Sequence, residues 1–202
     1  MLEVIRGSQT DQLDRDELLN LIARFHQVQV DLGTGDGRYA ARMARAHPDR
    51  LVIGVDAYRE NLRPTSRPSR APANALYVIA NALELPAELD QAADRISILL
   101  PWGSLLAGLL GSEPGILEGL DRMARLTAEL EIYLNVAALA EAGWELTAGA
   151  EQLRRMLPQA GFEPGEIEPL SVDELRRLPS SWARRLAAGP QPGSVRILAH
   201  RA

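Results

Sequence analysis

The sequence contains no cysteine and no lysine. Without cysteine, the chain can form no disulfide, no thiolate nucleophile and no cysteine-based metal site. Its three histidines, His26, His47 and His200, fall at no spacing that is typical of metal ligands. We therefore expect a protein that binds no metal.

Long hydrophobic runs are also absent. No apolar stretch approaches the roughly 20 residues that a membrane-spanning helix needs, and residues 1–6 lack the charged and apolar regions of a signal peptide. The 202 residues, 46% hydrophobic and 24% charged, suit a single hydrophobic core. We expect one domain over residues 1–202, monomeric, cytoplasmic and without membrane contact, in which residues 1–27 form an N-terminal hairpin and helix.

The most informative feature present is an apolar run, Val28–Asp31, that leads into a glycine-rich turn with Gly33, Gly35 and Gly37. Glycines at such a turn let a ligand approach the bare backbone, where the amide groups of a helix N-terminus face it. The dinucleotide fingerprint G-x-G-x-x-G places its third glycine one residue later, where Arg38 stands. This spacing favours S-adenosylmethionine (SAM) over NAD as the cofactor.

A second strand-like segment, Leu51–Asp56, ends on a carboxylate. In a parallel sheet, an acid at the end of the strand that follows the glycine turn can accept hydrogen bonds from both ribose hydroxyls of a cofactor. Asp56 is therefore our candidate for binding the ribose. The alternative is that Asp56 only caps the next helix and that the glycine turn is an ordinary turn.

Apolar runs and helical patterns alternate along the chain. The strand-like segments are 28–31, 51–56, 76–80, 96–100, 130–136, 167–170 and 195–199, and the helical ones are 38–46, 103–110, 116–126 and 150–160. Such alternation is typical of an α/β fold with a parallel, doubly wound sheet. We predict a Rossmann-like, class I SAM-dependent methyltransferase fold with a seven-stranded, mostly parallel sheet. An N-terminal β-hairpin over residues 2–10 and a helix capped by Asp14 precede it.

Ligands of doubly wound sheets bind at the C-terminal ends of the strands, so residues there are candidates for the site. Asn81 and the backbone amide of Ala82 follow one strand and are placed to meet the adenine amine and ring nitrogen of the cofactor. The alternative for Asn81 is a helix cap. Trp102 follows the next strand, between Pro101 and Gly103, where its own element cannot easily bury it. The alternative is a tryptophan of the hydrophobic core.

A second tryptophan, Trp182, lies in a segment that combines a polar turn, an aromatic face and paired arginines. Taken alone, this segment also fits the end of an amphipathic helix. Two tryptophans above one cofactor pocket would form a slot for a flat ring. Methyltransferases that act on structured nucleic acid take their base out of its stack, and an adenine fits between two indoles.

The charge balance gives a mixed indication for nucleic acid binding. All 22 basic residues are arginine, and the 27 acidic residues leave a net charge of −5, which disfavours binding through phosphate contacts. Arginines nevertheless gather in two places, at positions 59, 63, 67 and 70 and at positions 176, 177, 184 and 185. Arginine can bind phosphate bidentately and stack on bases. The alternative is a solvated surface.

These motifs resemble the Kam/Npm family of aminoglycoside-resistance 16S rRNA methyltransferases, which methylate N1 of adenine 1408. The resemblance is nearly chain-long and is carried by Asp31–Gly37, Gly54–Asp56, Ser97–Leu106 and Ser181–Leu186. Within these segments, Leu-Pro-Trp-Gly-Ser-Leu-Leu and Ser-Trp-x-Arg-Arg-Leu are specific, whereas the glycine turn is not.

The resemblance implies a SAM-dependent enzyme that acts on the 30S ribosomal subunit and confers aminoglycoside resistance. It needs no general base, because adenine N1 already carries a lone pair. Trp102 and Trp182 would hold the flipped adenine, Asp56 would bind the SAM ribose, and Ser180 and Ser181 would help to close the pocket. The candidate cofactor-binding residues are Asp31, Gly33, Gly35, Gly37, Asp56, Asn81, Ala82, Leu83, Leu99, Ser104, Ser180 and Ser181. The candidate RNA-binding residues are Arg63, Arg67, Arg70, Arg184 and Arg185.

Three departures from the family pattern keep other interpretations open. The loop 63–74 is shorter and proline-rich where the family is rich in lysine, Gly189–Gly193 stands where the family places basic residues, and Leu83 replaces an acid beside the cofactor adenine. These departures and the net charge favour a SAM-binding homologue with weak or no activity on the 30S subunit, or one that acts on another RNA. A third interpretation is a small-molecule methyltransferase, for whose lid domain the chain offers little length.

Overall fold

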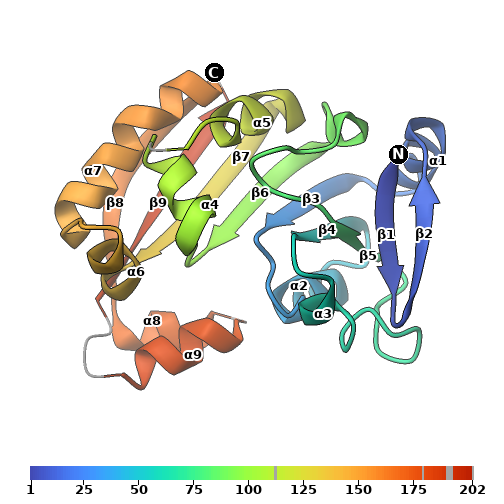
Figure 1. Cartoon of the computed structure of the whole chain (residues 1–202), viewed down its shortest axis with the longest axis horizontal. Coiled ribbons are helices and arrows are strands. Elements are labelled where there is room, and N and C mark those ends of the chain that lie inside the picture. The colour runs from blue at the N-terminus through green and yellow to red at the C-terminus, as the bar shows by residue number, and fades with distance from the viewer. Residues whose placement is uncertain (112, 179, 190–192, 202) are drawn as a thin grey trace.

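Among the residues that the structure describes, nine strands form one sheet in the order β2-β1-β5-β4-β3-β6-β7-β9-β8 (Figure 1). The strands are β1 (Leu2–Arg6), β2 (Gln9–Leu13), β3 (Gln27–Leu32), β4 (Arg50–Asp56), β5 (Ala75–Ile79), β6 (Ala93–Leu99), β7 (Ala124–Asn135), β8 (Phe162–Leu170) and β9 (Ser194–Arg201). The five strands β3, β4, β5, β6 and β7 are parallel to one another. In contrast, β9 is antiparallel to both β7 and β8. The fold is the α/β class that the alternating pattern predicts.

This computed structural model describes residues 1–111, 113–178, 180–189 and 193–201. The helices are α1 (Arg15–Ile22), α2 (Arg38–Ala46), α3 (Arg59–Leu62), α4 (Gly103–Leu109), α5 (Ile116–Met123), α6 (Val136–Glu141), α7 (Leu146–Met156), α8 (Val172–Arg177) and α9 (Ser181–Ala187). In these ranges, no helix is both long and apolar enough to cross a membrane. Most of the segment Gly189–Gly193, where the sequence lacks the family's basic residues, lies outside the described residues.

The seven predicted strands are all present, and the predicted hairpin adds two more to the same sheet. β1 pairs with β2 over its whole length, and Val4 of β1 also pairs with Val78 of β5. Leu2, Val4 and Ile5 are buried, so the hairpin shares the hydrophobic core. The sheet therefore has nine strands and not seven, because the hairpin extends it beyond β5.

The predicted helix over 116–126 is too long at its C-terminal end. In the structure, α5 ends at Met123, and Ala124 already pairs with Ala93 as the first residue of β7. Leu126, which the helical pattern includes, is 79% exposed on this strand. Periodicity alone does not show where a helix passes directly into a strand without an intervening turn.

The predicted helix over 150–160 is displaced. The α-helix α7 begins earlier, at Leu146, and ends at Met156. The chain continues to Ala160 as a tighter 3-10 turn with Pro158 near its start. Because proline has no backbone N–H, it cannot make the hydrogen bond that would continue the α-helix, and the regular helix ends before it.

The order of the strands reverses at β3. From β3 the chain builds β4 and β5 on one side and then crosses to β6 on the other side. In doubly wound sheets, such a reversal forms a crevice at the C-terminal ends of the two strands, and ligands bind there. Asp31 of β3 and Ser97 of β6 are partners in this pairing, so both lie on the seam.

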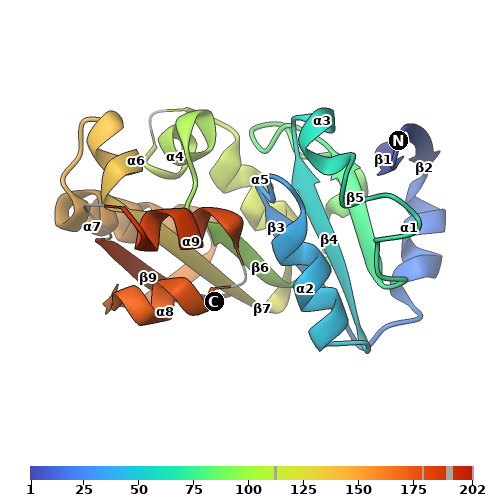
Figure 2. The ribbon, with the colours of Figure 1, turned by 90° about the horizontal axis from the view of Figure 1, so that it is seen from below.

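Hydrophobic residues on the two faces of the sheet form separate clusters. On one face, α5 and α7 pack on a large cluster that includes Leu120 and Leu153. On the other face, Ala40 of α2 and Leu62 of α3 pack with Tyr77 of β5. Figure 2 shows α4 and α6 on one side of the sheet and α2, α8 and α9 on the other. The helices of the second group therefore share a face with the glycine turn that begins α2.

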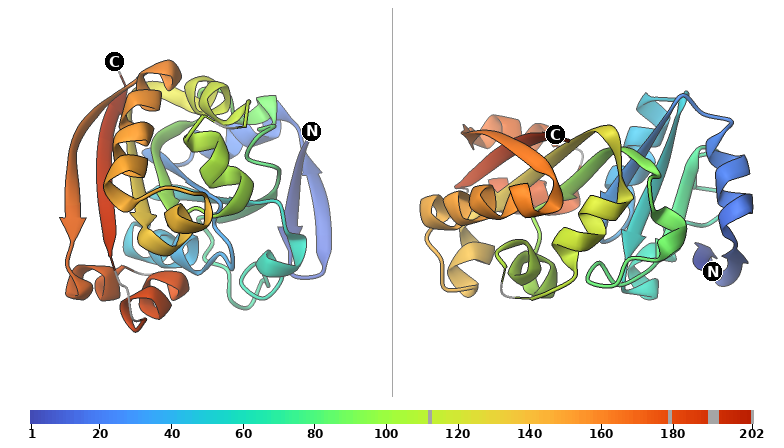
Figure 3. Two further views of the ribbon diagram at one scale, coloured as in Figure 1. Left: turned by 60° about the vertical axis from the view of Figure 1, so that its left-hand side comes forward. Right: turned by 90° about the horizontal axis from the view of Figure 1, so that it is seen from above.

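The helices α8 and α9 together form what we call the lid. Its buried residues Leu175, Ala183 and Ala187 pack with Leu100 and Tyr133 of the sheet region in a third hydrophobic cluster. Figure 3 (left) shows the lid at the same end of the molecule as α3. This is the end at which the parallel strands finish, so the fold places Trp182 of α9 above the strand ends.

Candidate functional site

A cavity of about 220 Å³, part of it open to solvent, lies where β3, β4, β5 and β6 end and where α9 begins. The predicted residues that line it are Asp31, Gly33, Gly35, Asp56, Asn81, Ala82, Leu99, Trp102, Ser104, Ser180, Ser181 and Trp182. The structure thus brings together four strand ends and the lid around one space.

Two residues predicted to bind the cofactor, Gly37 and Leu83, do not line the cavity. Gly37 has a φ of +70° at the start of α2, and a Cβ there would lie 2.7 Å from the ring of Tyr77. Leu83 packs on the hydrophobic core, with its Cδ2 atom 3.0 Å from the position of a Cβ at Gly108. The structure thus shows a packing role for both residues, and their contact with the cofactor stays a prediction.

The glycine turn after β3 is held against the end of β4. The N–H of Gly33 donates to the carbonyl of Val55 over 2.9 Å, and the N–H of Gly35 donates to the carboxylate of Asp56 over 2.8 Å. Gly33 and Gly35 have φ values of +72° and +58°, which L side chains rarely adopt. A Cβ at Gly33 would also lie 2.5 Å from Leu105. The fold itself therefore requires glycine at these two positions, whether or not a ligand is bound.

Asp56 faces the cavity from the end of β4. One carboxylate oxygen accepts the N–H of Gly35, the other accepts the N–H of Tyr58 over 2.9 Å, and the side chain of Asn61 adds a further hydrogen bond. Burial raises the pKa of Asp56, and these hydrogen bonds oppose the rise. Asp56 thus stabilises the turn into α3, as the alternative interpretation predicts. Because a carboxylate has about four acceptor positions, it can still accept a donor from a ligand.

Asp31 forms the buried floor of the cavity. Its carboxylate accepts hydrogen bonds from the hydroxyls of Thr34 and Ser97. Burial raises the pKa of Asp31 to about 7, the two hydroxyls oppose this rise, and the nearby carboxylates of Asp56 and Asp36 add to it. Three acids on one wall of the cavity suit a cationic ligand.

Asn81 behaves partly as its alternative interpretation predicts. Its side-chain oxygen accepts the N–H of Leu83 over 3.1 Å, so it stabilises the turn that follows β5. Asn81 and Ala82 nevertheless line the cavity. The amide group of Asn81 therefore fixes the local backbone next to the space in which a ligand would lie.

Trp102 lies at the cavity and not in the hydrophobic core, since 39% of it is exposed. The chain bends sharply around Trp102, because Leu100 and Gly103 both have a φ of +56°. For leucine this conformation costs about 1–2 kcal/mol. Leu100 is held in it by a hydrogen bond from its N–H to the Tyr133 carbonyl and by its burial beneath the lid. The bend leaves the indole of Trp102 outside the core.

Trp182 reaches the same place from the lid. Its ring stacks on that of Trp102, with the ring centroids 6.1 Å apart and the ring planes at 22°. Ser180 caps α9 by accepting the N–H of Ala183, and the guanidinium of Arg185 lies 5.5 Å from the Trp182 ring centroid. The two tryptophans that the sequence singles out are therefore neighbours in space, and α9 is the helix that carries the second one.

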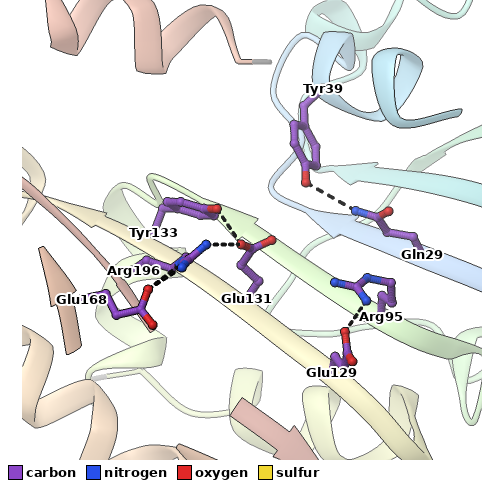
Figure 4. A network of polar contacts seen from close by, with 8 residues as sticks. All are labelled: Gln29, Tyr39, Arg95, Glu129, Glu131, Tyr133, Glu168 and Arg196. Carbon is purple, nitrogen blue, oxygen red and sulfur yellow. Dashed lines mark hydrogen bonds and ion pairs between the residues drawn. The ribbon is translucent and has the colours of Figure 1, made fainter. Parts of the chain in front are cut away.

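Polar side chains support the lid from below (Figure 4). The ring of Tyr133 belongs to the hydrophobic cluster under the lid, and its hydroxyl donates to Glu131 over 2.5 Å. Arg196 of β9 contacts Glu131 and binds Glu168 of β8 through its guanidinium. Burial and the hydrogen bond to Glu131 raise the pKa of Tyr133. Tyr133 therefore stays neutral and supports both the lid and the outer strands.

The cavity also contains residues that sequence reasoning missed, among them Asp36, Tyr39 and Tyr58. Asp36 lies between two of the glycines that the sequence singles out, so its place in the motif was a usable signal. Tyr58 is 73% exposed and follows the strand that ends at Asp56, which is the same reasoning that identifies Trp102. In the part of the chain that the structure describes, no cluster of His, Cys, Asp or Glu could hold a metal ion.

The predicted RNA-binding arginines lie around the site, and their charges differ in availability. Arg63 binds Glu60 over 2.8 Å, so part of its charge is neutralised. Arg67 and Arg70 lie in neighbouring open grooves, and Arg42 of α2 lines the same groove as Arg70. Within the described ranges, no carboxylate forms an ion pair with Arg42, Arg67, Arg70 or Arg184. Six other arginines do pair with acids: Arg95, Arg122, Arg125, Arg154, Arg196 and Arg201.

Comparison with known proteins gives matches over nearly the whole chain. The protein family described as NpmA: 16S rRNA (adenine(1408)-N(1))-methyltransferase matches residues 3–201. The 16S rRNA (adenine(1408)-N(1))-methyltransferase of Escherichia coli is 33% identical in an alignment that covers 98% of this chain and 97% of that protein.

Solved structures agree with this match. One is a tryptophan-to-alanine variant of the 16S rRNA (adenine(1408)-N(1))-methyltransferase from Catenulisporales acidiphilia with the cosubstrate SAM. It is 31% identical, with a TM-score of 0.87, and the match covers 100% of this chain and 97% of that one. Another is the aminoglycoside resistance methyltransferase NpmB1, which is 32% identical with a TM-score of 0.79 over 100% of both chains.

Proposed function

The chain belongs to the 16S rRNA (adenine(1408)-N(1))-methyltransferase family, and from this we propose that it methylates N1 of adenine 1408 in the 16S rRNA of the 30S subunit. SAM is the cofactor, as in the relative from Catenulisporales acidiphilia. The modification would confer resistance to aminoglycosides, the property named for NpmB1. We propose that the enzyme works as a cytoplasmic monomer without a metal ion.

The observation that carries this proposal is the stacked pair of Trp102 and Trp182 at the cavity. A base held between two rings needs two stacking gaps of about 3.4 Å, the rise between stacked bases. The centroid separation of 6.1 Å is the largest value that the gap between the two ring planes can have, and it is smaller than this sum. The rings must therefore move apart before a flat base fits between them.

The residues present fit SAM on three observations. The backbone of Gly35 is open, since nothing lies within 4 Å of the place a Cβ would take. Asp56 has acceptor capacity left for ribose hydroxyls. The acidic wall of Asp31, Asp36 and Asp56 suits a ligand with positive charge on its sulfur and amino group. SAM, when bound, supplies a methyl group that is already activated by its sulfonium sulfur.

The chain contributes alignment and not proton transfer. Adenine N1 is a neutral nucleophile with a free lone pair, so no side chain has to remove a proton from it. Trp102 and Trp182 orient the ring for attack, which lowers the entropic part of the barrier. The base becomes cationic on methylation, and the indole faces on either side stabilise a cationic ring. The two tryptophans therefore both position the base and favour its charged product.

Arginines without acidic partners support the ribosomal partner, despite the net charge of −5. Arg184 lies on α9, Arg42 and Arg70 line one groove along α2, and Arg67 lines the groove next to it. These four arginines pair with no carboxylate in the described ranges. An RNA backbone is bound through such local charges and not through the sum over the chain. We propose that these four arginines contact phosphates.

Two observations favour the alternative of a SAM-binding homologue with weak activity on the 30S subunit. Arg63, which the sequence predicts to bind RNA, is paired with Glu60 on the same helical turn. Arg185 is likewise engaged, because its guanidinium lies over the ring of Trp182. If both contacts persist, two of the five predicted RNA-binding arginines are less available to phosphate.

The test incubates the purified protein with 30S subunits and radiolabelled SAM, and then maps the modification by primer extension, because N1 methylation blocks the Watson–Crick edge. Subunits with guanine at position 1408 serve as the control. A reverse-transcription stop at adenine 1408 that is absent from the control supports the proposal. SAM binding without label in the subunit overturns it and favours the alternative.

A further inference from the structure

Asp36, in the glycine turn between β3 and α2, contacts two segments that are remote in the sequence. Its carboxylate accepts a hydrogen bond of 2.9 Å from the hydroxyl of Ser181, the first residue of α9. Its backbone carbonyl accepts a hydrogen bond of 2.6 Å from the hydroxyl of Thr65. The same carboxylate also accepts the N–H of Arg38 over 3.1 Å and lies 3.5 Å from its guanidinium.

The first contact joins the cavity wall to the lid. Ser181 directly precedes Trp182, so its hydrogen bond fixes the end of α9 that carries the stacked ring. The rest of α9 is held by apolar packing of Ala183 and Ala187, which tolerates small shifts better than a directional hydrogen bond does. Because the rings must separate to admit a base, the contact between Ser181 and Asp36 holds the end of α9 that would have to move.

The second contact joins the cavity wall to the arginine loop. Thr65 lies between Arg63 and Arg67, and a Cβ at Gly37 would lie only 3.5 Å from the Thr65 Cβ atom. The loop is thus both hydrogen-bonded to and packed against the turn that contains Asp36. If this turn moves, the Thr65 side chain, which is hydrogen-bonded to it and packed against it, would move the loop as well.

We propose that Asp36 is a positioning residue that couples the cofactor-binding turn to Trp182 and to the arginine loop, so that a ligand in the cavity sets the position of both elements. This inference rests on the proposed function, in which Trp182 and the arginines contact the RNA. Asp36 lines the cavity, and the N–H of its neighbour Gly35 donates a hydrogen bond to Asp56. A ligand in the cavity would therefore contact this turn directly.

The variants that test the coupling remove one hydrogen bond at a time. Ser181→Ala removes the contact to the lid, Thr65→Val removes the contact to the loop, and Ser181→Thr restores a hydroxyl at the first position. Ser8→Ala, at an exposed serine of the hairpin, is the matched control. For each protein, the SAM dissociation constant is measured by calorimetry, and kcat and KM are measured on 30S subunits.

We expect Ser181→Ala to keep the SAM dissociation constant within about twofold and to lower kcat by about tenfold, the size expected for a hydrogen bond to a charged acceptor. Thr65→Val should instead raise KM for the 30S subunit, because it affects the loop, and Ser181→Thr should restore most of the activity. The inference is overturned if Ser181→Ala has the kinetics of the Ser8→Ala control. It is also overturned if Ser181→Ala loses SAM affinity as strongly as activity, since Ser181 would then bind the cofactor directly.

A second measurement needs no RNA. In a Trp144→Phe background, the stacked Trp102 and Trp182 are the remaining tryptophans of the three in the chain. Both indoles line the cavity, so SAM can also affect their emission directly. The coupling therefore predicts a larger change of emission when Ser181 is present than in Ser181→Ala. Equal responses in both proteins would overturn the coupling. A lack of 30S methylation by the unaltered protein would contradict the proposed function, while this fluorescence result would still decide the coupling.

Discussion

The carboxylate of Asp31 on β3 accepts a hydrogen bond of 3.1 Å from the hydroxyl of Ser97, its partner in the pairing with β6. Both residues are buried, at 2% exposure each. The contact lies on the seam where the strand order reverses, and Asp31 also forms part of the cavity wall. One titratable group therefore belongs both to the core of the sheet and to the site.

We expect the free energy of unfolding to fall as the pH rises from about 5 to about 8. Burial raises the pKa of Asp31 from the ordinary value of 3.8 to about 7. Over this interval the folded state holds a proton on Asp31 that the unfolded chain has released, so a higher pH favours unfolding. The stabilisation is complete below pH 3.8 and is lost as the pH passes 7. Urea unfolding at several pH values measures this slope.

The variant Asp31→Asn isolates the contribution of this group. It keeps the size of the side chain and removes the titration, so its stability should fall less between pH 5 and pH 8 than that of the unaltered protein. Some slope will persist, because burial also raises the pKa of Asp56. Equal slopes for the two proteins would show that Asp31 is already ionised in the folded state at pH 5.

Asp56→Ala should weaken SAM binding by about tenfold to a hundredfold while the fold persists. A hydrogen bond to a charged acceptor contributes about 1.5–3 kcal/mol, and the variant also frees the N–H of Gly35, which holds the glycine turn. Calorimetry measures the affinity, and circular dichroism checks the fold. Asp11→Ala, at an exposed acid of the hairpin, should bind SAM normally. Unchanged affinity in Asp56→Ala would remove Asp56 from the cofactor site.

Trp182→Ala should keep its SAM affinity and lose methylation. Removing one stacking partner of a base costs about 1–3 kcal/mol, or roughly one to two decades in rate if the loss is felt in the transition state. Trp182→Phe keeps an aromatic face and should retain most of the activity. Single-turnover methylation of 30S subunits measures the effect. A turnover equal to that of the unaltered protein would mean that the adenine lies elsewhere.

Arg42→Ala combined with Arg70→Ala should weaken 30S binding and make it less sensitive to salt. Each phosphate contact that is lost lowers the slope of log K against log salt by about 0.7–0.9. Filter binding at several salt concentrations measures this slope. Arg154→Ala is the control, because Arg154 is near Glu151 on α7, away from the site. A slope that matches the control would exclude the groove along α2 from the RNA interface.

The α/β class, the glycine turn, Asp56 and both tryptophans could be predicted from the sequence. Each depends on a local pattern: alternating apolar runs, glycine spacing, or a polar or aromatic residue after a strand. That Trp102 and Trp182 stack could be inferred only from the family resemblance, because their contact depends on how the lid packs on Leu100 and Tyr133. No local pattern carries that information.

The packing of Gly37 and Leu83 could not be predicted from the sequence for a related reason. Both belong to motifs at the cavity, but a motif does not show which of its residues pack inside the protein. In the structure, Gly37 lies against Tyr77 and Leu83 lies against Gly108. The hydrogen bond between Asp36 and Ser181 could not be predicted, because a contact over such a sequence separation leaves no periodic signal.

The outer edge strand β8 has a further consequence. It contains Pro164 and Pro169, which have no N–H to offer to another strand, and its acids Glu163 and Glu166 place negative charge along the edge. A free edge of this length is otherwise a template for strand addition and aggregation between chains. The prolines and like charges of β8 therefore disfavour the pairing of this edge with a strand of a second molecule.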